Sequence, residues 1–457
     1  MRETRLVCDK FNFINILEVV GKKAANQHAS FYVKGHIDID SDEYVLKSSA
    51  GESVTFTAFD WEGEKKIFDG IISGIKIHTE NELRTLYVKV SSRSTLMDVE
   101  PEIRTFQDAN MTYKTVTSRI EEASPNFTFL WPTHGERPID SMTVQYNITD
   151  WEYAKQLAGR LGTVVITDYL LDKPYISIGM PKRPAKPGIN AISYTTEKDV
   201  RRFRNAKSSG RFTERDAVSY VVKSREIFDL CDPISFLDLS LYVYAIETRY
   251  EGGELVHYYT LKEDSGFYTE KVFNKDLVGA SLRGTVKEIK EDKVRVNILD
   301  DVAQTEHKWF LYATPFSQPD GFGWYFMPEI GDEIRLQFPS EKEDDAFVSS
   351  AVHITHGNRC DPDVKFIRTV YGQIIQFDPE KIQIDDGKGS SVVIHKDHGI
   401  FLETDKIVNM EAKEEIIMSA TGKVVITGQD GVVIQKGDSV VCVDDAIDIS
   451  SDHTRVQ

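Results

Sequence analysis

The sequence predicts a mainly β protein with few helices, and two kinds of pattern support this prediction. Apolar and polar residues alternate with a period of two in short runs bounded by turn residues, which is typical of strands with one buried face. These runs include 53–59, 86–90, 218–222, 294–298 and the whole C-terminus. Helical spacing of apolar residues is confined to 113–123 and 149–162, where Thr149 or Asp150 can cap the start of the second helix and Gly162 can end it.

Length and composition limit the class of protein. The 457 residues suggest about three domains. Hydrophobic residues make up 40% and charged residues 28%, which is ordinary for a soluble chain with a core. The chain contains no run of about eighteen apolar residues, which is the length needed to span a membrane. Its N-terminus also lacks the apolar stretch of a secretory signal. If the protein leaves the cell, we therefore expect a route that does not use a cleaved signal.

Charge and cysteine content exclude further classes. A net charge of −18 disfavours nucleic acid and anionic membranes as stable partners. Cys8, Cys231, Cys360 and Cys442 are far apart and form no C-x-x-C pair. We expect free thiols rather than a disulfide framework or a zinc site.

Three segments are typical of boundaries between domains. Segment 181–188 is rich in Pro and Lys, 271–279 leads into a new set of strands, and 357–363 precedes a repeat. These boundaries divide the chain into a first part over 1–275 with a possible linker at 181–188, a second part over 280–356 and a repeat domain over 364–457.

The C-terminal repeat is the most informative feature. From Ser391 to Ala446 the chain divides into seven consecutive octads whose second and fourth residues are apolar, and the pattern stops at Asp448. Residues two apart in a strand point to the same face, so each octad directs one apolar pair to one face, and its last four residues suit a corner. The predicted core positions are Val392, Ile394, Ile400, Leu402, Val408, Met410, Ile416, Met418, Val424, Ile426, Val432, Ile434, Val440 and Cys442.

The length of the repeat favours three chains. A β-helix of hexapeptides needs roughly eighteen residues to close one triangular rung, so an octad supplies about a third of a rung. Seven octads would give a single chain barely two rungs with exposed edges, whereas three chains would build seven rungs. We expect a homotrimer, and a single-chain solenoid is the alternative. Substituting Asp for Ile416, which would recur three times around the axis, is expected to abolish assembly.

Octads of this kind resemble the needle of the VgrG (valine–glycine repeat) spikes of type VI secretion and the puncturing spikes of contractile phage tails. Segment 281–353 is similar to the oligonucleotide/oligosaccharide-binding (OB) barrel of these proteins, above all at 323–334, where an aromatic cluster and Pro328 precede Gly-Asp-Glu. In the first 270 residues, the motifs that resemble the hub, in the expected order, are Phe68-Asp69-Gly70-Ile71-Ile72, Phe106-Gln107-Asp108 and Gln145-Tyr146.

The resemblance implies a spike that links the inner tube of a contractile injection system to its tip. Its hub would contain two small β-barrels per chain, so that three chains offer six similar barrels to a hexameric inner-tube protein, beside baseplate components. An OB neck and an intertwined trimeric β-helix would follow, and effector cargo would cross a target membrane that the spike contacts only transiently. The chain shows no metal-binding tip motif, so we expect a separate PAAR-like protein to complete the tip.

Several groups of residues resemble metal-binding, catalytic or phosphate-binding motifs but lack the spacing or the setting that such sites require. They are the pairs His353/His356 and His395/His398, the acidic segment 38–42, the trio Glu329, Asp332 and Glu333, and the Gly-Lys-Gly-Ser run 387–390. Residues three apart in a strand point to opposite faces, the acidic segment lacks the Gly and Glu of a calcium loop, and the carboxylates occupy a turn. We expect no catalytic residue, no cofactor and no metal.

Because many OB barrels bind nucleic acid, the charge of this segment was used to judge whether it could do so. Segment 280–353 contains fourteen acidic and eight basic residues, a net charge of −6. Trp324, Tyr325 and Phe326 could stack on bases, but single-stranded nucleic acid requires a positive groove. We expect a structural barrel that binds no nucleic acid.

Two other functions stay open at this point. One is a tail-associated glycan hydrolase or a β-helical polysaccharide lyase, which turnover of glycan by the purified protein would reveal. The other is a trimeric glycan-binding fibre or adhesin, which would lie at the periphery of a particle rather than on its axis.

Overall fold

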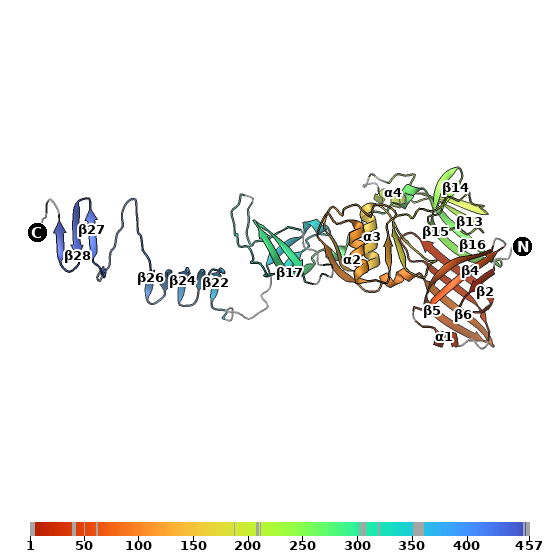
Figure 1. Ribbon diagram of the computed structural model, residues 1–457, viewed down its shortest axis with the longest axis horizontal. Helices are drawn as coiled ribbons and strands as arrows, with labels where there is room; N and C mark the ends of the chain where they lie inside the picture. The colour runs from red at the N-terminus through yellow and green to blue at the C-terminus, as the bar shows by residue number, and fades with distance from the viewer. Residues whose placement is uncertain are drawn as a thin grey trace. The chain divides into compact units, whose positions relative to one another are not determined.

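A computed structural model gives the fold (Figure 1). It describes residues 5–38, 43–49, 51–60, 63–186, 188–206, 210, 212–299, 301, 303, 308–318, 320–350, 361–450 and 453. The chain divides into two compact units, 1–353 and 354–457. The first unit contains the residues of the predicted hub and of the OB barrel, and the second contains the repeat.

The N-terminal part of the first unit is a small barrel. Its elements are β1 (Arg5–Cys8), β2 (Phe13–Ala24), β3 (Ser30–Ile37), α1 (Glu43–Lys47), β4 (Ser53–Asp60), β5 (Gly63–Glu80) and β6 (Leu83–Ser91). The strands are hydrogen-bonded in the order β1-β4-β5-β6-β3-β2. Alternate residues fill the barrel, and among them the ring of Phe31 stacks on Phe68 and contacts the tilted ring of Phe56. Gly70 is required because a Cβ there would meet the carbonyl oxygen of Ser91.

A second barrel continues the same sheet. Its elements are β12 (Ser193–Lys198), α4 (Val200–Ala206), β13 (Val218–Ser224), β14 (Pro233–Phe236), β15 (Leu239–Glu251) and β16 (Glu254–Lys262). Strand β2 of the first barrel pairs antiparallel with β15, from Ala24 opposite Ala245 to Val20 opposite Arg249. Figure 1 shows the two barrels, red and green, joined there. One eleven-stranded sheet therefore spans both barrels.

The two barrels are copies of one topology. In chain order, β2 to β6 are arranged β4-β5-β6-β3-β2, and β12 to β16 are arranged β14-β15-β16-β13-β12. Both long hairpins turn through two residues with positive φ, 81–82 and 252–253. Both carry a bulge at the same level, between Ile72 and Gly74 and between Val243 and Ala245. The sheet thus contains an internal duplication.

A mixed α/β part is inserted between the barrels. Its elements are the 3-10 helix η2 (Arg93–Met97), β7 (Glu102–Phe106), α2 (Tyr113–Ala123), β8 (Thr128–Leu130), β9 (Thr143–Ile148), α3 (Asp150–Leu161), β10 (Val165–Thr167) and β11 (Tyr175–Ile178). Helix α3 begins with a capping box in which Thr149 and Glu152 exchange hydrogen bonds, and it ends at Gly162 with φ of 72°. Both predicted helices are confirmed.

The OB barrel follows two short 3-10 segments. Its elements are β17 (Ser281–Lys290), β18 (Lys293–Ile298), β19 (Phe310–Leu311), β20 (Glu333–Gln337), η6 (Glu343–Asp345) and β21 (Phe347–Ser350), after η4 (Asp264–Phe267) and η5 (Lys275–Leu277). The sheet order is β19-β18-β17-β20-β21. A bridge between Tyr312 and Val348 joins the two outer strands, so the sheet closes on itself.

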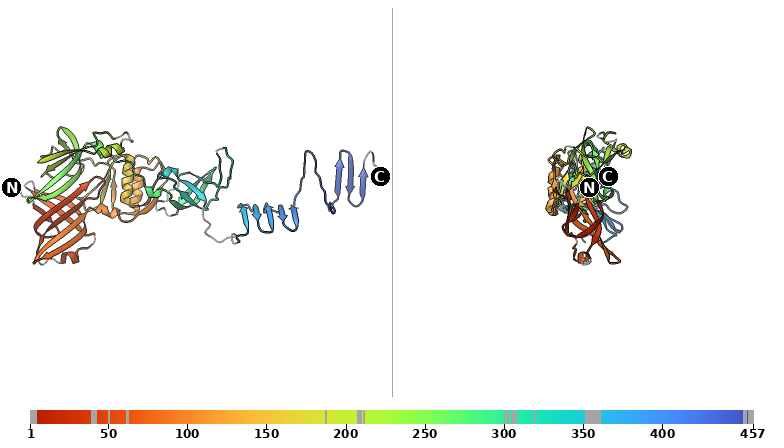
Figure 2. Two further views of the ribbon diagram at one scale, coloured as in Figure 1. Left: turned by 180° about the vertical axis from the view of Figure 1, so that it is seen from behind. Right: turned by 90° about the vertical axis from the view of Figure 1, so that its right-hand side faces the viewer.

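The second unit consists of two antiparallel meanders (Figure 2). The first contains β22 (Lys365–Arg368), β23 (Ile374–Phe377), β24 (Lys381–Asp385), β25 (Ser391–His395) and β26 (Gly399–Glu403). The second contains β27 (Val432–Lys436), β28 (Ser439–Val443) and β29 (Ile447–Ser450). Residues 404–431 between them contain no strand.

The mainly β class is confirmed. In the possible linker 181–188, Lys186 pairs with Ile234 of β14, and its N–H donates to the carbonyl of Pro233 at 2.9 Å. Among the described residues, no helix is long and apolar enough to cross a membrane.

Candidate functional site: apolar and polar assembly surfaces

The first meander of the second unit has one continuous apolar face. Register places Val392 opposite Leu402 and Ile394 opposite Ile400, so four predicted core residues share a face. The same register adds residues from the three preceding strands. The apolar face consists of Ile367, Ile375, Phe377, Ile382, Ile384, Val392, Ile394, Ile400 and Leu402. The opposite face is mainly polar, with Gln376, Gln383 and Glu403 among its residues.

This apolar face is exposed in the single chain. Eight of its nine residues are exposed, with fractions between 37% at Ile367 and 74% at Ile400, and Val392 is partly buried. Contiguous apolar patches of this kind are rare on monomers and mark contact with another chain. The sequence analysis did not predict Ile367, Ile375, Phe377, Ile382 and Ile384 as core residues, because they precede the first octad. The alternation of apolar and polar residues in 374–377 and 381–385 could have revealed most of them.

The three middle octads behave differently. Val408, Met410, Ile416, Met418, Val424 and Ile426 are all exposed and lie outside any strand. Between residues 405 and 430, the only backbone–backbone hydrogen bond within the described chain is accepted by Gly428. Strand-forming residues without a partner in their own chain require hydrogen bonds from elsewhere.

The last meander divides the remaining predicted core residues between two faces. Val432 lies opposite Val443 and Ile434 opposite Val441, whereas Val440 and Cys442 lie on the other face, with Val433. The expected single face is therefore interrupted. The cause is the length of the turn: two residues, 437–438, connect β27 to β28, whereas three residues connect β25 to β26. An even turn exchanges the faces of odd and even residues. Strand β29 also continues pairing past the predicted end at Asp448.

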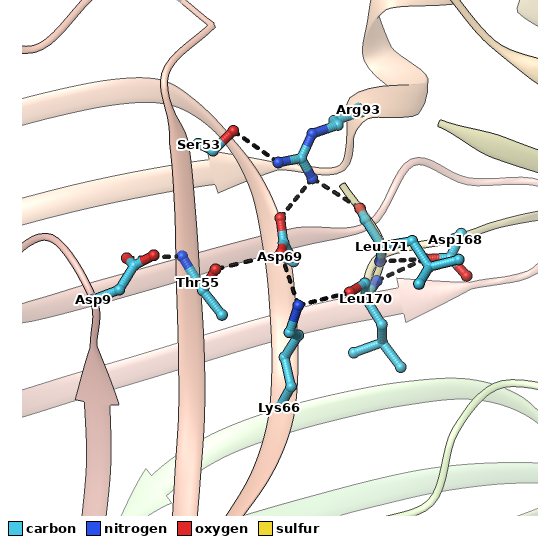
Figure 3. Close-up of polar contacts among 9 residues, drawn as sticks. All are labelled: Asp9, Ser53, Thr55, Lys66, Asp69, Arg93, Asp168, Leu170 and Leu171. Atoms are coloured by element: carbon cyan, nitrogen blue, oxygen red, sulfur yellow. Dashed lines mark hydrogen bonds and ion pairs between the residues drawn. The ribbon is translucent and has the colours of Figure 1, made fainter. Parts of the chain in front are cut away.

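A buried polar network stabilises the first barrel against the α/β part (Figure 3). Nη1 of Arg93, at the start of η2, donates to Oδ1 of Asp69 in β5 at 2.6 Å and to the carbonyl of Leu171 at 3.0 Å. Nη2 donates to Ser53 Oγ at 2.8 Å. Lys66 Nζ donates to the other Asp69 oxygen at 3.0 Å and to the carbonyl of Leu170 at 3.1 Å. Asp69 belongs to the predicted hub motif, and only the structure identifies its partners.

The α/β part and the OB barrel share contacts within the first unit. Met142 and Val144 of the β9 region belong to the same core as the OB strands. Arg160 of α3 forms an ion pair with Glu343, and both side chains are nearly buried. Asn274 Nδ2 donates to the carbonyl of Tyr146 at 2.7 Å. Apolar and charged contacts therefore couple hub and barrel.

Two buried basic side chains, His257 of β16 and Lys23 of β2, lie near each other where the two barrels join. Burial lowers the pKa of His257 to about 3, with the charges of Lys23 and Lys65 acting in the same direction. Burial lowers the pKa of Lys23 to about 8, although Asp229 opposes this shift. His257 Nδ1 and Thr248 Oγ1 are 2.9 Å apart, and Nε2 of His257 has no hydrogen-bond partner among the described residues.

The residues that imitate chemical sites do not assemble into one. In the described part of the chain, no three His, Cys, Asp or Glu side chains are grouped as metal ligands. Asp332 accepts from the Glu329 N–H at 2.8 Å, as expected for a turn. His353, His356 and most of segment 38–42 lie outside the described residues. The rings of His395 and His398 are 4.5 Å apart, contrary to the expectation that they diverge, because the β25–β26 turn folds one onto the other.

Comparison with known proteins adds to this geometry. Residues 282–353 match the family model of the type VI secretion system/phage-baseplate injector OB domain. No curated protein matches the chain. Among solved structures, the E. coli c3393 protein is 12% identical with a TM-score of 0.55, over 75% of this chain and 99% of that one. It is described as a component of the type VI secretion system that resembles the T4 bacteriophage tail proteins gp27 and gp5.

A chain of the Francisella PdpA–VgrG complex is also similar. It is 9% identical with a TM-score of 0.56, over 89% of this chain and 80% of that one. At such identities the likeness concerns the fold. Residues 282–353 thus match the injector OB domain of type VI secretion systems and phage baseplates, and most of the chain shares its fold with a type VI secretion component and with a chain of a PdpA–VgrG complex.

Proposed function

We propose that three copies of this protein form the central spike of a contractile injection system, either type VI secretion-like or phage-tail-like. The observation that carries this proposal is the exposed apolar face of β22–β26. Three such faces turned toward one axis would form a closed prism with a dry interior. The proposed role is mechanical: the spike links the inner tube to the tip and transmits force along its axis.

The middle octads support association in a second way. Residues 404–431 contain strand-forming apolar residues and no strand within their own chain. In a trimer, the same segment of the other two copies would supply the missing backbone partners, as in an intertwined β-helix. Trimerisation and the folding of this segment would then be inseparable.

The internal duplication supports the proposed contact with an inner tube. Each chain contains two barrels of one topology, so three chains would present six similar barrels. That number matches a hexameric tube protein. Shared contacts such as Arg160–Glu343 would carry load from the hub into the OB neck.

Further partners are proposed on the likeness to VgrG-containing complexes. They are baseplate components, a PAAR-like tip protein and effector cargo, with a target membrane crossed only transiently. Assembly would take place in the cytoplasm before export of the particle.

The native mass tests the proposal. Sedimentation equilibrium of the full chain is expected to give three times 51.9 kDa. A monomer at micromolar concentration would contradict it. Immunogold labelling of purified particles distinguishes an axial spike from a peripheral fibre, because label away from the tube axis would favour the fibre.

A further inference from the structure

The second barrel carries an insertion that the first barrel lacks. In the internal duplication, β12 and β13 are the counterparts of β2 and β3. Strands β2 and β3 are joined by the five residues 25–29, whereas β12 and β13 are joined by the nineteen residues 199–217, which include α4. Figure 1 shows α4 beside the second barrel. The shared topology forms in the first barrel without such a connector, so it does not explain the insertion.

The insertion is anchored against the second barrel. Nη2 of Arg202 in α4 donates to the carbonyl oxygens of Gly266 and Tyr268 at 3.0 and 2.6 Å. The Arg202 guanidinium also lies 5.0 Å from the ring centroid of Phe212. Phe212 is buried in a small core of the insertion, against which Phe203 packs. Helix α4 therefore presents a fixed outer face.

The outer face of α4 is basic and lacks a counter-charge. Arg201 and Arg204 are exposed, and neither forms an ion pair with any described residue. Arg215 of the same insertion, by contrast, is paired with Glu263 at 2.7 Å. Like charges three or four residues apart on a helix repel each other. The pair of Arg201 and Arg204 therefore lowers the stability of α4 unless a group outside the chain binds it.

The composition of the insertion indicates what kind of group this is. Residues 199–217 contain six basic and three acidic residues, a net charge of +3, within a chain of net charge −18. The seven residues of α4 are only about 10 Å long. An extended polyanion such as nucleic acid would reach beyond them onto acidic surface and be repelled there. A short acidic segment of a protein avoids this repulsion, and its carboxylates match the donors of a guanidinium.

We propose that the outer face of α4 is a docking surface for an acidic segment of another protein of the particle, bound through Arg201 and Arg204. Because only the second barrel carries the insertion, three chains would offer this surface three times, although their six barrels are otherwise alike. The partner therefore meets the spike with threefold rather than sixfold symmetry. The threefold count rests on the proposed function, whereas the acidic character of the partner does not.

Photo-cross-linking in assembled particles tests the surface. The photoreactive residue p-benzoylphenylalanine replaces Asn205, which is exposed in α4 beside Arg204. Adducts formed on irradiation are identified by mass spectrometry, and we expect linkage to a segment rich in Asp and Glu from a different protein. Linkage to a segment without carboxylates, to nucleic acid or to a second copy of this chain would overturn the proposal, and so would the absence of any adduct.

Charge substitutions provide matched variants in the same photoreactive background. Arg201→Gln/Arg204→Gln is expected to lower the adduct yield by at least about tenfold, because two charge-assisted contacts are lost. Arg201→Lys/Arg204→Lys keeps both charges and should stay within about threefold of the parent. The control Lys287→Gln/Lys290→Gln removes two exposed charges from β17 and should leave the yield unchanged.

The native mass separates a failure of this surface from a failure of the proposed spike. All these variants retain Arg202 and the small core of the insertion, so each should have the same mass as the parent in sedimentation equilibrium. A trimer whose adduct yield is equal in the Gln and Lys variants of α4 overturns the docking surface and leaves the spike intact. A monomeric parent overturns the spike, whereas an acidic adduct that depends on Arg201 and Arg204 would still support the surface.

Discussion

The guanidinium of Arg93 donates to the carboxylate of Asp69 at 2.6 Å, and only 9% and 8% of the two side chains are exposed. Arg93 starts η2, directly after the first barrel, and Asp69 lies in β5 of that barrel. Because Arg93 also binds the carbonyl of Leu171, this pair holds the α/β part against the barrel.

Removing Asp69 should therefore destabilise the hub. Asp69→Ala leaves the Arg93 charge buried without a counterion, and we expect the free energy of unfolding to fall by about 3–5 kcal/mol. Lys66→Ala is the matched control, since Lys66 binds the same carboxylate but is 45% exposed, and should cost at most about 1 kcal/mol. Urea denaturation followed by hub tryptophan fluorescence measures both. Equal losses of unfolding free energy in the two variants would show that the buried Arg93–Asp69 pair contributes no more than the exposed contact of Lys66.

Ile416→Asp should prevent assembly through the middle octads. Three carboxylates would be brought to one level of the axis, where burial disfavours charge. Sedimentation velocity is expected to show loss of the trimer. Ile417→Asp is the control, because the neighbouring residue of a strand points to the opposite face. An Ile416→Asp protein that stays trimeric, or equal effects at both positions, would count against the proposed axis.

The last meander offers a test between two registers. The octad pattern places Val440 on the same face as Val432 and Ile434, whereas the strand pairing places Val441 on that face. We expect Val441→Asp to open β27–β29 to limited proteolysis while the chain stays trimeric, and Val440→Asp to have little effect. The reverse result would restore the octad register.

Acid should weaken the hub through His257. Its folded pKa is about 3 because of burial, against about 6.5 for an unfolded chain. The unfolded state therefore binds a proton that the folded state does not, and stability falls as the pH decreases from about 6.5 toward 3. At pH 5 this loss is about 2 kcal/mol.

Denaturation at pH 7 and pH 5 measures this slope. His257→Gln should flatten it by about that amount, whereas His78→Gln should not, since the His78 side chain is 54% exposed. An unchanged slope in His257→Gln would assign the acid sensitivity to other groups.

Local patterns were sufficient for part of the fold and of the candidate site. Period-two alternation predicted strands, and Thr149 with Gly162 predicted α3, because these signals depend on neighbours in the chain. The apolar pairs Val392/Ile394 and Ile400/Leu402 were placed on one face by spacing alone, and the register confirms that they share it.

Other features depend on which segments meet. The face of Val440 and Cys442 depends on the two-residue turn 437–438, which exchanges odd and even positions. Arg93 and Asp69 are 24 residues apart and meet only when η2 packs beside β5. The likeness of the two barrels lies in their strand order, register and bulges, whereas equivalent residues differ, as at the hairpin turns, where Asn81 and Glu82 correspond to Gly252 and Gly253. By itself the sequence determined the β class, the two longer helices and the repeat, because these follow from local spacing. Tertiary structure decided the duplication and the continuous sheet, because both arise from pairing between distant strands.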